Sequence, residues 1–524
     1  MTTAADAVDR RRRMRLAVGA FLGLAAGMVA MASLEAMLVP IQNDFVLGVD
    51  DVNVLVLAVS AGALLVLFAA GGLVDRVGAG RVAVVGAGAA TAGALLVGVS
   101  AGLPMLMAGR IVGGIGGTAL GVAAMALLNE DFTDDRQRAW VFGLFAAFTG
   151  IIFAVTPVIS GLISDALSWR FVPILWIACA VGAALLTRTV RTPGPSRAAE
   201  AREAVTPWAA GLALSALCLS ALLLKQGPLY AGVALAVTVA ALVTLVARWR
   251  WLRAHGRQPA LDTSVFRRPG AKALAGAMLT VGVVNLFFYA NLYLQYRLGL
   301  SPAQAAAIRI LPQAAGIAGG LLGGWLSARW GSVTTSAVAL AVGCAAALGF
   351  ALVREESGAW PVIVLLMAFT LPAGCVTGTL TKAFLDCADT SASGAAASWR
   401  QACWSVGATL GGVAAGAVVL SYFTRTWSRS LEEAGVDLET TTWMAESVRG
   451  GVPLTQVGAS VATMDTPARQ AIEDFVGLAA AQVSTLRLVA FLAALAYGTS
   501  LAFVLVARWR QRQGTSAGAP DARG

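Results

Sequence analysis

A single carboxylate interrupts the first apolar stretch of the chain. Glu35 is the one charged residue between Leu16 and Val39. Burial disfavours the charged form of a carboxylate and raises its pKa, so a group in this position can take up and release protons. Ionisable residues inside apolar spans usually have a function. We therefore predict that Glu35 binds a proton or recognises a cation, the alternative being a carboxylate at the wet rim of a cavity.

Two arginines lie inside other apolar stretches. Arg110 stands a third of the way into the fourth stretch, and Arg309 lies about 8–10 Å inside a later one at the usual helical rise per residue. A guanidinium is costly in apolar surroundings, so each arginine should face the protein interior and meet a polar partner. For Arg110 the alternative is a side chain that extends back to the interface.

Polar residues near Arg309 indicate a ligand cavity. Aromatic rings beside a few hydrogen-bonding groups suit an amphiphilic ligand, and Phe287 and Phe288 supply the rings. The cavity candidates are Asn285, Tyr289, Asn291, Arg309 and Gln313. Each of them alone could instead serve packing or lie at an interface.

Other residue types that carry chemistry form no recognisable site. The six cysteines occur singly, without Cys-x-x-Cys or Cys/His spacing, and His255 is the only histidine. The sequence contains no Walker-type loop and no Ser/His/Asp arrangement. We therefore expect no enzymatic activity, no metal and no cofactor. ATP is not an evident energy source, and a proton gradient is the simplest substitute.

The composition predicts a membrane protein. Of the 524 residues, 58% are hydrophobic and 13% are charged, whereas soluble domains have about 25% charged residues. Apolar stretches of about 20 residues, the length of a membrane-spanning helix, recur along the chain. We predict fourteen such helices, at residues 16–40, 53–73, 82–102, 105–128, 139–163, 170–190, 207–224, 229–248, 273–295, 304–327, 333–353, 360–384, 396–420 and 486–507.

Basic residues predict the orientation of these helices. Arginine-rich loops follow alternate helices, and such loops are typical of the cytoplasmic side. Both ends of the chain are therefore expected in the cytoplasm, and the net charge of +10 is no sign of nucleic-acid binding. The predicted parts are a cytoplasmic tail (1–15), a six-helix half (16–190), a linker (191–206), two inserted helices (207–248), a basic linker (249–272), a second six-helix half (273–507) with a long external loop (422–484), and a cytoplasmic tail (508–524).

Two short segments of the chain resemble each other. GGLVDRVG at 71–78 follows the second predicted helix, and GWLSARWG at 324–331 follows the tenth. Both have Gly, Leu, Arg and Gly at the same positions. If the inserted pair is set aside, both segments follow the second helix of a six-helix half. Repeated halves of this kind are typical of secondary transporters.

The first of these segments resembles the loop motif of the major facilitator superfamily. GRIVGGIGG at 109–117 is similar to the fourth-helix motif of that family, and SWRFVP at 168–173 to the start of its sixth helix. SWRQACWSVGATLGG at 398–412 resembles the thirteenth helix of the fourteen-helix drug:proton antiporter branch. The resemblance covers nearly the whole chain. It implies an all-α polytopic membrane protein of the 6+2+6 type, with two pseudo-symmetric six-helix halves.

The resemblance also implies a cytoplasmic gate and a role in proton transfer for Arg110. Asp75 and Arg76 would form contacts that break and reform as the halves rock during alternating access. The alternative is a solvated turn beside lipid headgroups. The gate motif comprises Gly71, Asp75, Arg76, Gly78, Arg81 and, in the second copy, Arg329.

Small residues at helix crossings are expected to allow close approach. The packing candidates are Gly113, Gly114, Gly117, Pro157, Gly161 and Gly411. The fifth helix departs from the antiporter pattern, because Thr156 and Ser160 occupy positions where the family has glycine. In the first helix, Met31 stands where the branch has its acid. A role for Glu35 is therefore a hypothesis specific to this sequence.

These observations favour a secondary active transporter that exports small amphiphilic organic compounds, drug-like or antibiotic-like, by proton antiport. One alternative is a proton-linked importer, which the departures in the fifth helix support. Another is a non-transporting scaffold or sensor with a transporter fold. The expected partners are a small-molecule substrate, protons and the lipid bilayer, without nucleic acid. We expect a monomer in the inner membrane of a bacterium.

Overall fold

Every regular element in the part of the chain that the structure describes is a helix. The computed structural model describes residues 4–45, 49–131, 135–188, 205–223, 228–257, 263–282, 286–354, 356–387, 396, 398–412, 414, 418 and 483–516. Within these ranges, ten helices are long and apolar enough to cross a membrane, and three shorter apolar helices accompany them. The prediction of an all-α membrane protein is confirmed, and its 6+2+6 division stays a prediction.

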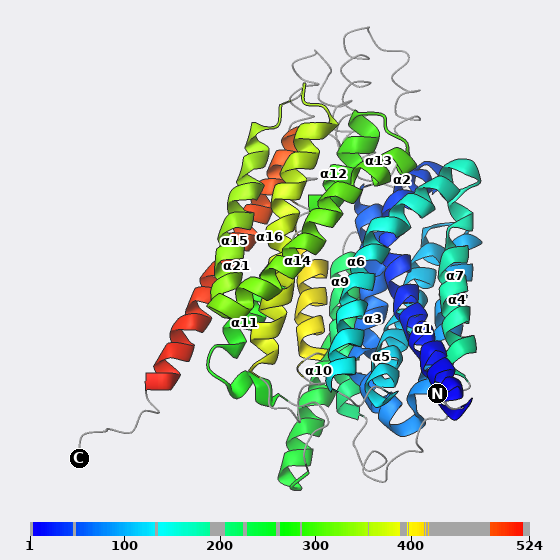
Figure 1. The fold of residues 1–524 in the computed structure, drawn as a ribbon, viewed down its shortest axis with the longest axis vertical. Helices are drawn as coiled ribbons and strands as arrows, with labels where there is room; N and C mark the ends of the chain where they lie inside the picture. Colours follow the sequence, from blue (N-terminus) through cyan, green and yellow to red (C-terminus); the bar gives the residue numbers. More distant parts are fainter. Residues whose placement is uncertain are drawn as a thin grey trace. The chain divides into compact units, whose positions relative to one another are not determined.

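The chain divides into two compact units. Unit 1 comprises Met1–Leu34, Leu55–Thr263 and Gly394–Ala402, and unit 2 comprises Glu35–Val54, Ser264–Ser393 and Cys403–Gly524. Most of unit 1 is formed by α1 (Ala4–Ala32), α3 (Val49–Val77), α4 (Ala79–Gly98), α5 (Leu103–Asp131), α6 (Asp135–Ala166), η1 (Trp169–Phe171), α7 (Pro173–Thr187), α9 (Val205–Leu223) and α10 (Pro228–Ala254) (Figure 1).

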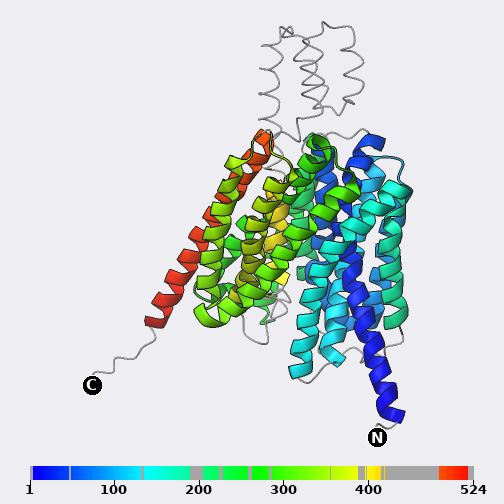
Figure 2. The ribbon, with the colours of Figure 1, turned by 45° about the horizontal axis from the view of Figure 1, so that its top comes forward.

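Unit 2 contains the remaining elements. They are α2 (Leu34–Phe45), η2 (Ser264–Arg267), α11 (Ala271–Gly282), α12 (Leu286–Leu292), the π-helix η3 (Tyr293–Arg297), α13 (Pro302–Ile308), α14 (Ile310–Trp330), α15 (Ser332–Leu348), η4 (Gly349–Leu352), α16 (Ala359–Leu385) and α21 (Val483–Ser516). The long helix α21 packs against α11 and α15, and its course beside α15 can be followed in Figure 1 and Figure 2.

Three predicted helices differ from single straight rods. The first begins at Ala4, well before residue 16, and is interrupted by a turn at Ser33. The ninth ends in the π-helix η3, and its residues 283–285 lie outside the described ranges. The tenth is divided at Arg309 into α13 and α14. Pro312 explains the last break, because it has no N–H to donate to the carbonyl one turn earlier.

Glycines allow the helices that carry the candidate site to pack backbone to backbone. In unit 1 a Cβ on Gly62 of α3 would overlap the carbonyl oxygen of Ile111, and one on Gly114 of α5 would overlap that of Val59. In unit 2 the crossing of α14 and α16 is built in the same way, with Gly319 against Leu371. Small residues are the usual means of close helix approach in membranes, where burial drives association weakly.

The two similar segments end in turns of the same conformation. Gly78, between α3 and α4, has φ 93° and ψ 144°, and Gly331, between α14 and α15, has φ 78° and ψ 151°. A positive φ is a conformation that glycine adopts at little cost. Both motif glycines are therefore required by their turns, and the two similar segments share this backbone conformation.

A pair of arginine contacts extends the repeat to the other end of the same helices. Arg170 donates from Nη1 to the carbonyl oxygen of Ser100 at 2.7 Å, just after α4. Arg487 donates from Nε to the carbonyl oxygen of Val353 at 2.8 Å, just after α15 and η4. Ser100 and Val353 stand at the same spacing from Gly78 and Gly331, and in each unit an arginine of a later helix, η1 or α21, donates to the carbonyl at this position.

Candidate functional site

Arg110 lies in the interior of unit 1. Its side chain is 2% exposed, and its Nη1 donates to the carbonyl oxygen of Ala30 in α1 at 2.7 Å. The guanidinium carbon is 6.0 Å from the centre of the Trp176 ring of α7. Among the residues that the structure describes, no acceptor reaches Arg110 Nε and no carboxylate forms an ion pair with the group. Arg110 is therefore a buried cation that faces inward, as expected, with spare donor capacity.

The interruption of the first helix lies beside Arg110. Trp176 donates from Nε1 to the hydroxyl oxygen of Ser33 at 2.8 Å, and both groups are buried. Ser33 forms the turn between α1 and α2, so Arg110 and Trp176 together hold this break from within unit 1. Glu35 follows the break by two residues and is the first residue assigned to unit 2. Its backbone belongs to α2, and its side chain lies outside the described residues.

A second buried arginine lies in unit 2. Arg309 is 4% exposed and occupies the break between α13 and α14. Its Nη1 donates to Oδ1 of Asn291 at 3.0 Å, and its guanidinium carbon is 5.2 Å from the centre of the Phe287 ring. The structure thus brings together two of the predicted cavity residues, Arg309 and Asn291, across 18 positions of sequence. A cation, an amide and an aromatic ring here form a compact polar group inside an apolar unit.

The other predicted cavity residues lie close to this group in the sequence. Tyr289 is buried in α12, with its ring edge-on to Phe288 at 5.0 Å between centres. Gln313 is half-buried in α14, one turn after Arg309, whose carbonyl oxygen accepts from the Gln313 N–H at 3.3 Å. Asn285 lies outside the described residues.

Gln295 is a candidate that the sequence analysis missed. It lies in the π-helix η3, four residues after Asn291, and is 8% exposed. Neither its Oε1 nor its Nε2 has a hydrogen-bond partner in the described part of the chain. An unpaired buried amide costs about 1–3 kcal/mol, and π-helical turns occur often at functional sites. The available signal was a glutamine inside an apolar span, one helical turn from an asparagine already singled out.

The gate motif occupies the turn between α3 and α4. Gly71 and Arg81 are exposed, Arg76 is half-buried and Gly78 is buried. In the second copy, Arg329 is exposed, and its guanidinium carbon lies 3.9 Å from the centre of the Trp325 ring. The side chain of Asp75 lies outside the described residues. The gate role of these residues stays a prediction.

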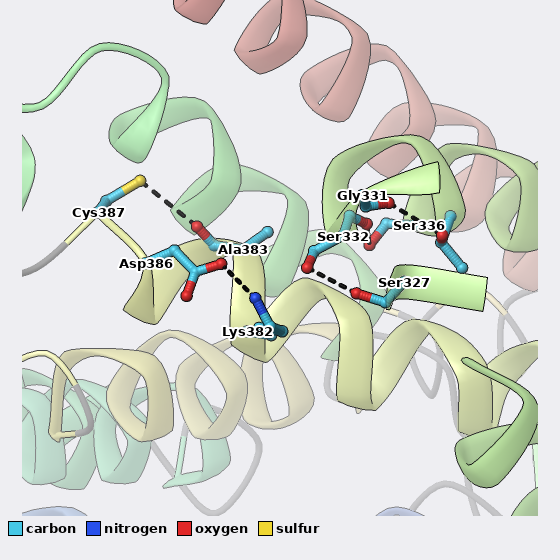
Figure 3. A network of polar contacts seen from close by, with 9 residues as sticks. Ser327, Gly331, Ser332, Ser336, Lys382, Ala383, Asp386 and Cys387 are labelled. Atoms are coloured by element: carbon cyan, nitrogen blue, oxygen red, sulfur yellow. Dashed lines mark hydrogen bonds and ion pairs between the residues drawn. The ribbon is translucent and has the colours of Figure 1, made fainter. Parts of the chain in front are cut away.

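Hydroxyl groups join the helices around the second copy of the motif (Figure 3). Ser327 and Ser332 share a hydrogen bond of 2.8 Å across the turn. Ser336 shares one of 2.7 Å with Thr379 of α16. The corresponding positions of unit 1, counted from the motif glycine, are the apolar core residues Val74, Ala79 and Ala83. Equivalent turns in the two units are therefore stabilised by different chemistry.

At the end of α16, close to this turn, Lys382 forms an exposed ion pair of 2.8 Å with Asp386 (Figure 3). Cys387 donates from its thiol to the carbonyl oxygen of Ala383. Burial, and to a lesser extent the Asp386 carboxylate, raise the pKa of the Cys387 thiol, while Arg268 lowers it. The thiol is thus held protonated and is a poor nucleophile.

The fifth predicted helix, α6, contains the residues that depart from the antiporter pattern. Pro157, Gly161, Thr156 and Ser160 are all buried. In the described part of the chain, the hydroxyl of Ser160 has no hydrogen-bond partner. A side chain with a hydroxyl group therefore lies in the interior of unit 1 where the antiporter pattern has a glycine. Gly411, the packing candidate of the thirteenth predicted helix, is also buried.

Curated relatives are 24–28% identical to this chain over the regions that align. The methylenomycin A resistance protein of Streptomyces coelicolor is 27% identical over 365 residues, which are 68% of this chain and 75% of the relative. The protein of the same name from Bacillus subtilis is 28% identical over 69% of this chain and 77% of the relative. The multidrug efflux pump LfrA of Mycolicibacterium smegmatis is 24% identical over 82% and 81%.

Solved structures show the same fold. A bacterial homologue of the human lysosomal transporter Spinster, in an inward-facing and occupied conformation, superposes with a TM-score of 0.61 at 16% identity, over 96% of this chain and 98% of that one. A proton-dependent oligopeptide transporter superposes with a TM-score of 0.57 at 14% identity, over 95% and 99%. These likenesses concern the arrangement of helices.

The model of the Major Facilitator Superfamily matches residues 16–412. This range begins in α1 and ends in the thirteenth predicted helix, so it includes both copies of the loop motif, Arg110 and Arg309. The match and the transporter names of the relatives identify a membrane transporter rather than an enzyme. The chain belongs to the Major Facilitator Superfamily.

Proposed function

We propose that this transporter exports small amphiphilic organic compounds, drug-like or antibiotic-like, in exchange for protons. The observation that carries the proposal is Arg110, a buried guanidinium held on the break of the first helix two residues before Glu35. A fixed positive charge favours the deprotonated form of a nearby carboxylate, while burial favours the protonated form. Movement of the chain at the break would change this balance and so couple protonation to conformation. The resistance and efflux names of the relatives support export.

The group formed by Arg309, Asn291 and Phe287, together with Gln295 four residues after Asn291, is our candidate for substrate recognition. A ring and a stacked guanidinium suit a flat apolar ligand, and the amide of Gln295 offers one donor pair and one acceptor. We further propose a 6+2+6 helix arrangement, a monomer, and both termini in the cytoplasm of a bacterium. In this arrangement several arginine-rich loops fall on the same side of the membrane, which supports the orientation.

Transport in inverted membrane vesicles tests the function. Vesicles that contain the protein are acidified inside, and methylenomycin A and the fluorescent cation ethidium are supplied outside. We expect accumulation of at least one compound that collapses when a protonophore is added. Accumulation that survives the protonophore would exclude proton antiport. Accumulation in right-side-out vesicles under an inward proton gradient would instead identify an importer.

Glu35→Gln is expected to abolish gradient-driven transport in this assay. The amide has nearly the shape of the carboxyl group but cannot exchange a proton. Folding and membrane insertion should be unchanged, which thermal unfolding of the purified protein checks. Asp44→Gln, at an exposed position on the same helix α2, is the control and should retain transport. Full transport by the Glu35 variant would remove this carboxylate from the coupling mechanism.

Gln295→Leu is expected to raise stability and lower transport together. Leucine fills a similar volume without a buried unpaired amide, so the free energy of unfolding should rise by about 1–2 kcal/mol. Loss of a ligand contact should raise the substrate concentration for half-maximal transport by about tenfold. The same substitution at exposed Gln304, whose Oε1 accepts from the Ser301 N–H at 3.0 Å, should lower stability and leave transport unchanged. Normal transport by Gln295→Leu would mean that Gln295 has a packing role and does not contact the substrate.

A further inference from the structure

The same six residues occur near the ends of two helices. Leu-Val-Ala-Arg-Trp-Arg occupies 245–250 in α10 and 505–510 in α21. In each case a long apolar span precedes it. Neither helix contains an aspartate or a glutamate. Both copies therefore place two arginines around a tryptophan where an apolar helix becomes basic, and no carboxylate of the same helix neutralises them.

On α10 the basic and aromatic side chains are stacked. The guanidinium carbon of Arg253 lies 3.8 Å from the centre of the Trp249 ring, and that of Arg248 lies 4.4 Å from Trp251. The ring of His255 lies 4.3 Å from that of Trp251. A stacked guanidinium uses its face and leaves its N–H edges available. Such edges are suited to bidentate contact with phosphate oxygens.

The basic end of α10 projects from its neighbour. Only residues 224–227 separate the end of α9 from the start of α10, and the two helices pack against each other, so α10 begins beside the end of α9. Since α10 has 27 residues and α9 has 19, the end of α10 extends about 12 Å past α9 at 1.5 Å per residue. Arg250, Arg253 and Arg257 are exposed there.

The rest of α10 has the surface of a lipid-facing helix. Large apolar side chains remain exposed along it, namely Leu229, Val233, Leu235, Val239, Leu242, Val243 and Val246. An apolar face of this length indicates contact with acyl chains. The tryptophans that follow it are typical of the interface between hydrocarbon and headgroups. Basic residues that directly follow such a span are expected at the depth of lipid phosphates.

We propose that the basic end of α10, residues 248–257, binds the phosphate headgroup of an anionic phospholipid. Arg250 and Arg253 donate to the phosphate, Trp249 and Trp251 lie beside the glycerol region, and an acyl chain lies along the exposed apolar face of the same helix. The copy on α21 has Gln511 and Gln513 at the positions of Trp251 and Arg253. It lacks the stack and binds more weakly. The site requires neither a direction of transport nor proton coupling.

Lipid retention by the full chain tests the proposal. Protein in vesicles of equal parts phosphatidylglycerol and phosphatidylcholine is solubilised in mild detergent, and its bound lipids are counted by native mass spectrometry. We expect wild type to retain phosphatidylglycerol selectively. The double variant Arg250→Gln/Arg253→Gln should bind it about 30-fold more weakly, because each basic residue near an anionic headgroup contributes about fivefold. Trp249→Leu, which leaves the charge unchanged, should weaken binding several-fold.

Three comparisons separate this site from general attraction. Arg15→Gln/Arg188→Gln removes two exposed arginines elsewhere in unit 1 and should leave retention unchanged. Arg508→Gln/Arg510→Gln should have a smaller effect than the α10 variant. Inorganic phosphate at millimolar concentration should not displace the lipid. Equal losses in the α10 and control variants, unchanged binding in Trp249→Leu, or displacement by free phosphate would each overturn the proposal.

Discussion

The rate of proton-coupled transport is expected to fall at least tenfold in Arg110→Gln, while the protein remains folded. The substitution removes the fixed charge beside the break of the first helix and, because glutamine is shorter, also the hydrogen bond to the Ala30 carbonyl oxygen. A fixed charge changes the free energy of ionisation of a coupled acid, and about 1.4 kcal/mol corresponds to a tenfold change in that equilibrium. Stability should fall by about 1 kcal/mol, because the hydrogen bond to the Ala30 carbonyl oxygen is lost. Transport is measured in inverted vesicles, and stability by thermal unfolding.

Arg170 provides a matched control for this variant. Its Nη1 also donates to a backbone carbonyl oxygen at 2.7 Å, that of Ser100. Arg170 lies in the short helix η1, however, and is not at the break beside Glu35. Arg170→Gln should therefore lower stability by about 1 kcal/mol and retain the pH dependence of transport. If Arg110→Gln transports at the wild-type rate with the wild-type response to pH, the proposed role of Arg110 in coupling is wrong.

Gly114→Ala is expected to destabilise unit 1 strongly, and Gly113→Ala is not. A Cβ on Gly114 would overlap the carbonyl oxygen of Val59, a backbone atom of α3 that cannot move without the helix. A Cβ on Gly113 would meet no atom within 4 Å. Overpacking of this kind costs about 1–3 kcal/mol and occasionally more. Alanine at position 113 should instead be neutral or stabilising, because it favours the helix by up to about 1 kcal/mol.

The same contrast recurs in unit 2. Gly319→Ala would place a Cβ on the carbonyl oxygen of Leu371, whereas at Gly320 the nearest atom is 3.8 Å away. Thermal unfolding of the four purified variants measures both pairs. We expect the apparent melting temperature to fall for the alanine variants at positions 114 and 319 and to stay unchanged for those at positions 113 and 320. Equal effects within each pair would mean that the helices do not cross as closely as the structure shows.

The membrane class and the family could be predicted because their signals are local. Uninterrupted apolar stretches of helix length are sufficient to indicate membrane spans. The glycines of the loop motif are visible as residue types, and Gly78 and Gly331 occupy backbone conformations that favour glycine. The inward position of Arg110 followed from the cost of a charge in apolar surroundings.

The partners of the buried polar residues could not be predicted in this way. When nearly every face of a helix is apolar, the residue pattern does not show which face points inward. The sequence analysis therefore treated Gly113 and Gly114 alike and grouped Asn291 with Tyr289 and Gln313. Rotation of each helix about its axis distinguishes them, and that rotation depends on the neighbours against which the helix packs.

The sequence by itself determined an all-helical membrane protein with a repeated loop motif, a carboxylate in its first span and arginines inside two others. Those properties depend on residue type and on distances along the chain. Only the tertiary structure decided that Arg110 donates to Ala30, that Arg309 pairs with Asn291, and that the Gln295 amide is buried without a partner among the described residues. These contacts join residues on different helices or depend on a π-helical turn, so the packing of whole helices sets them.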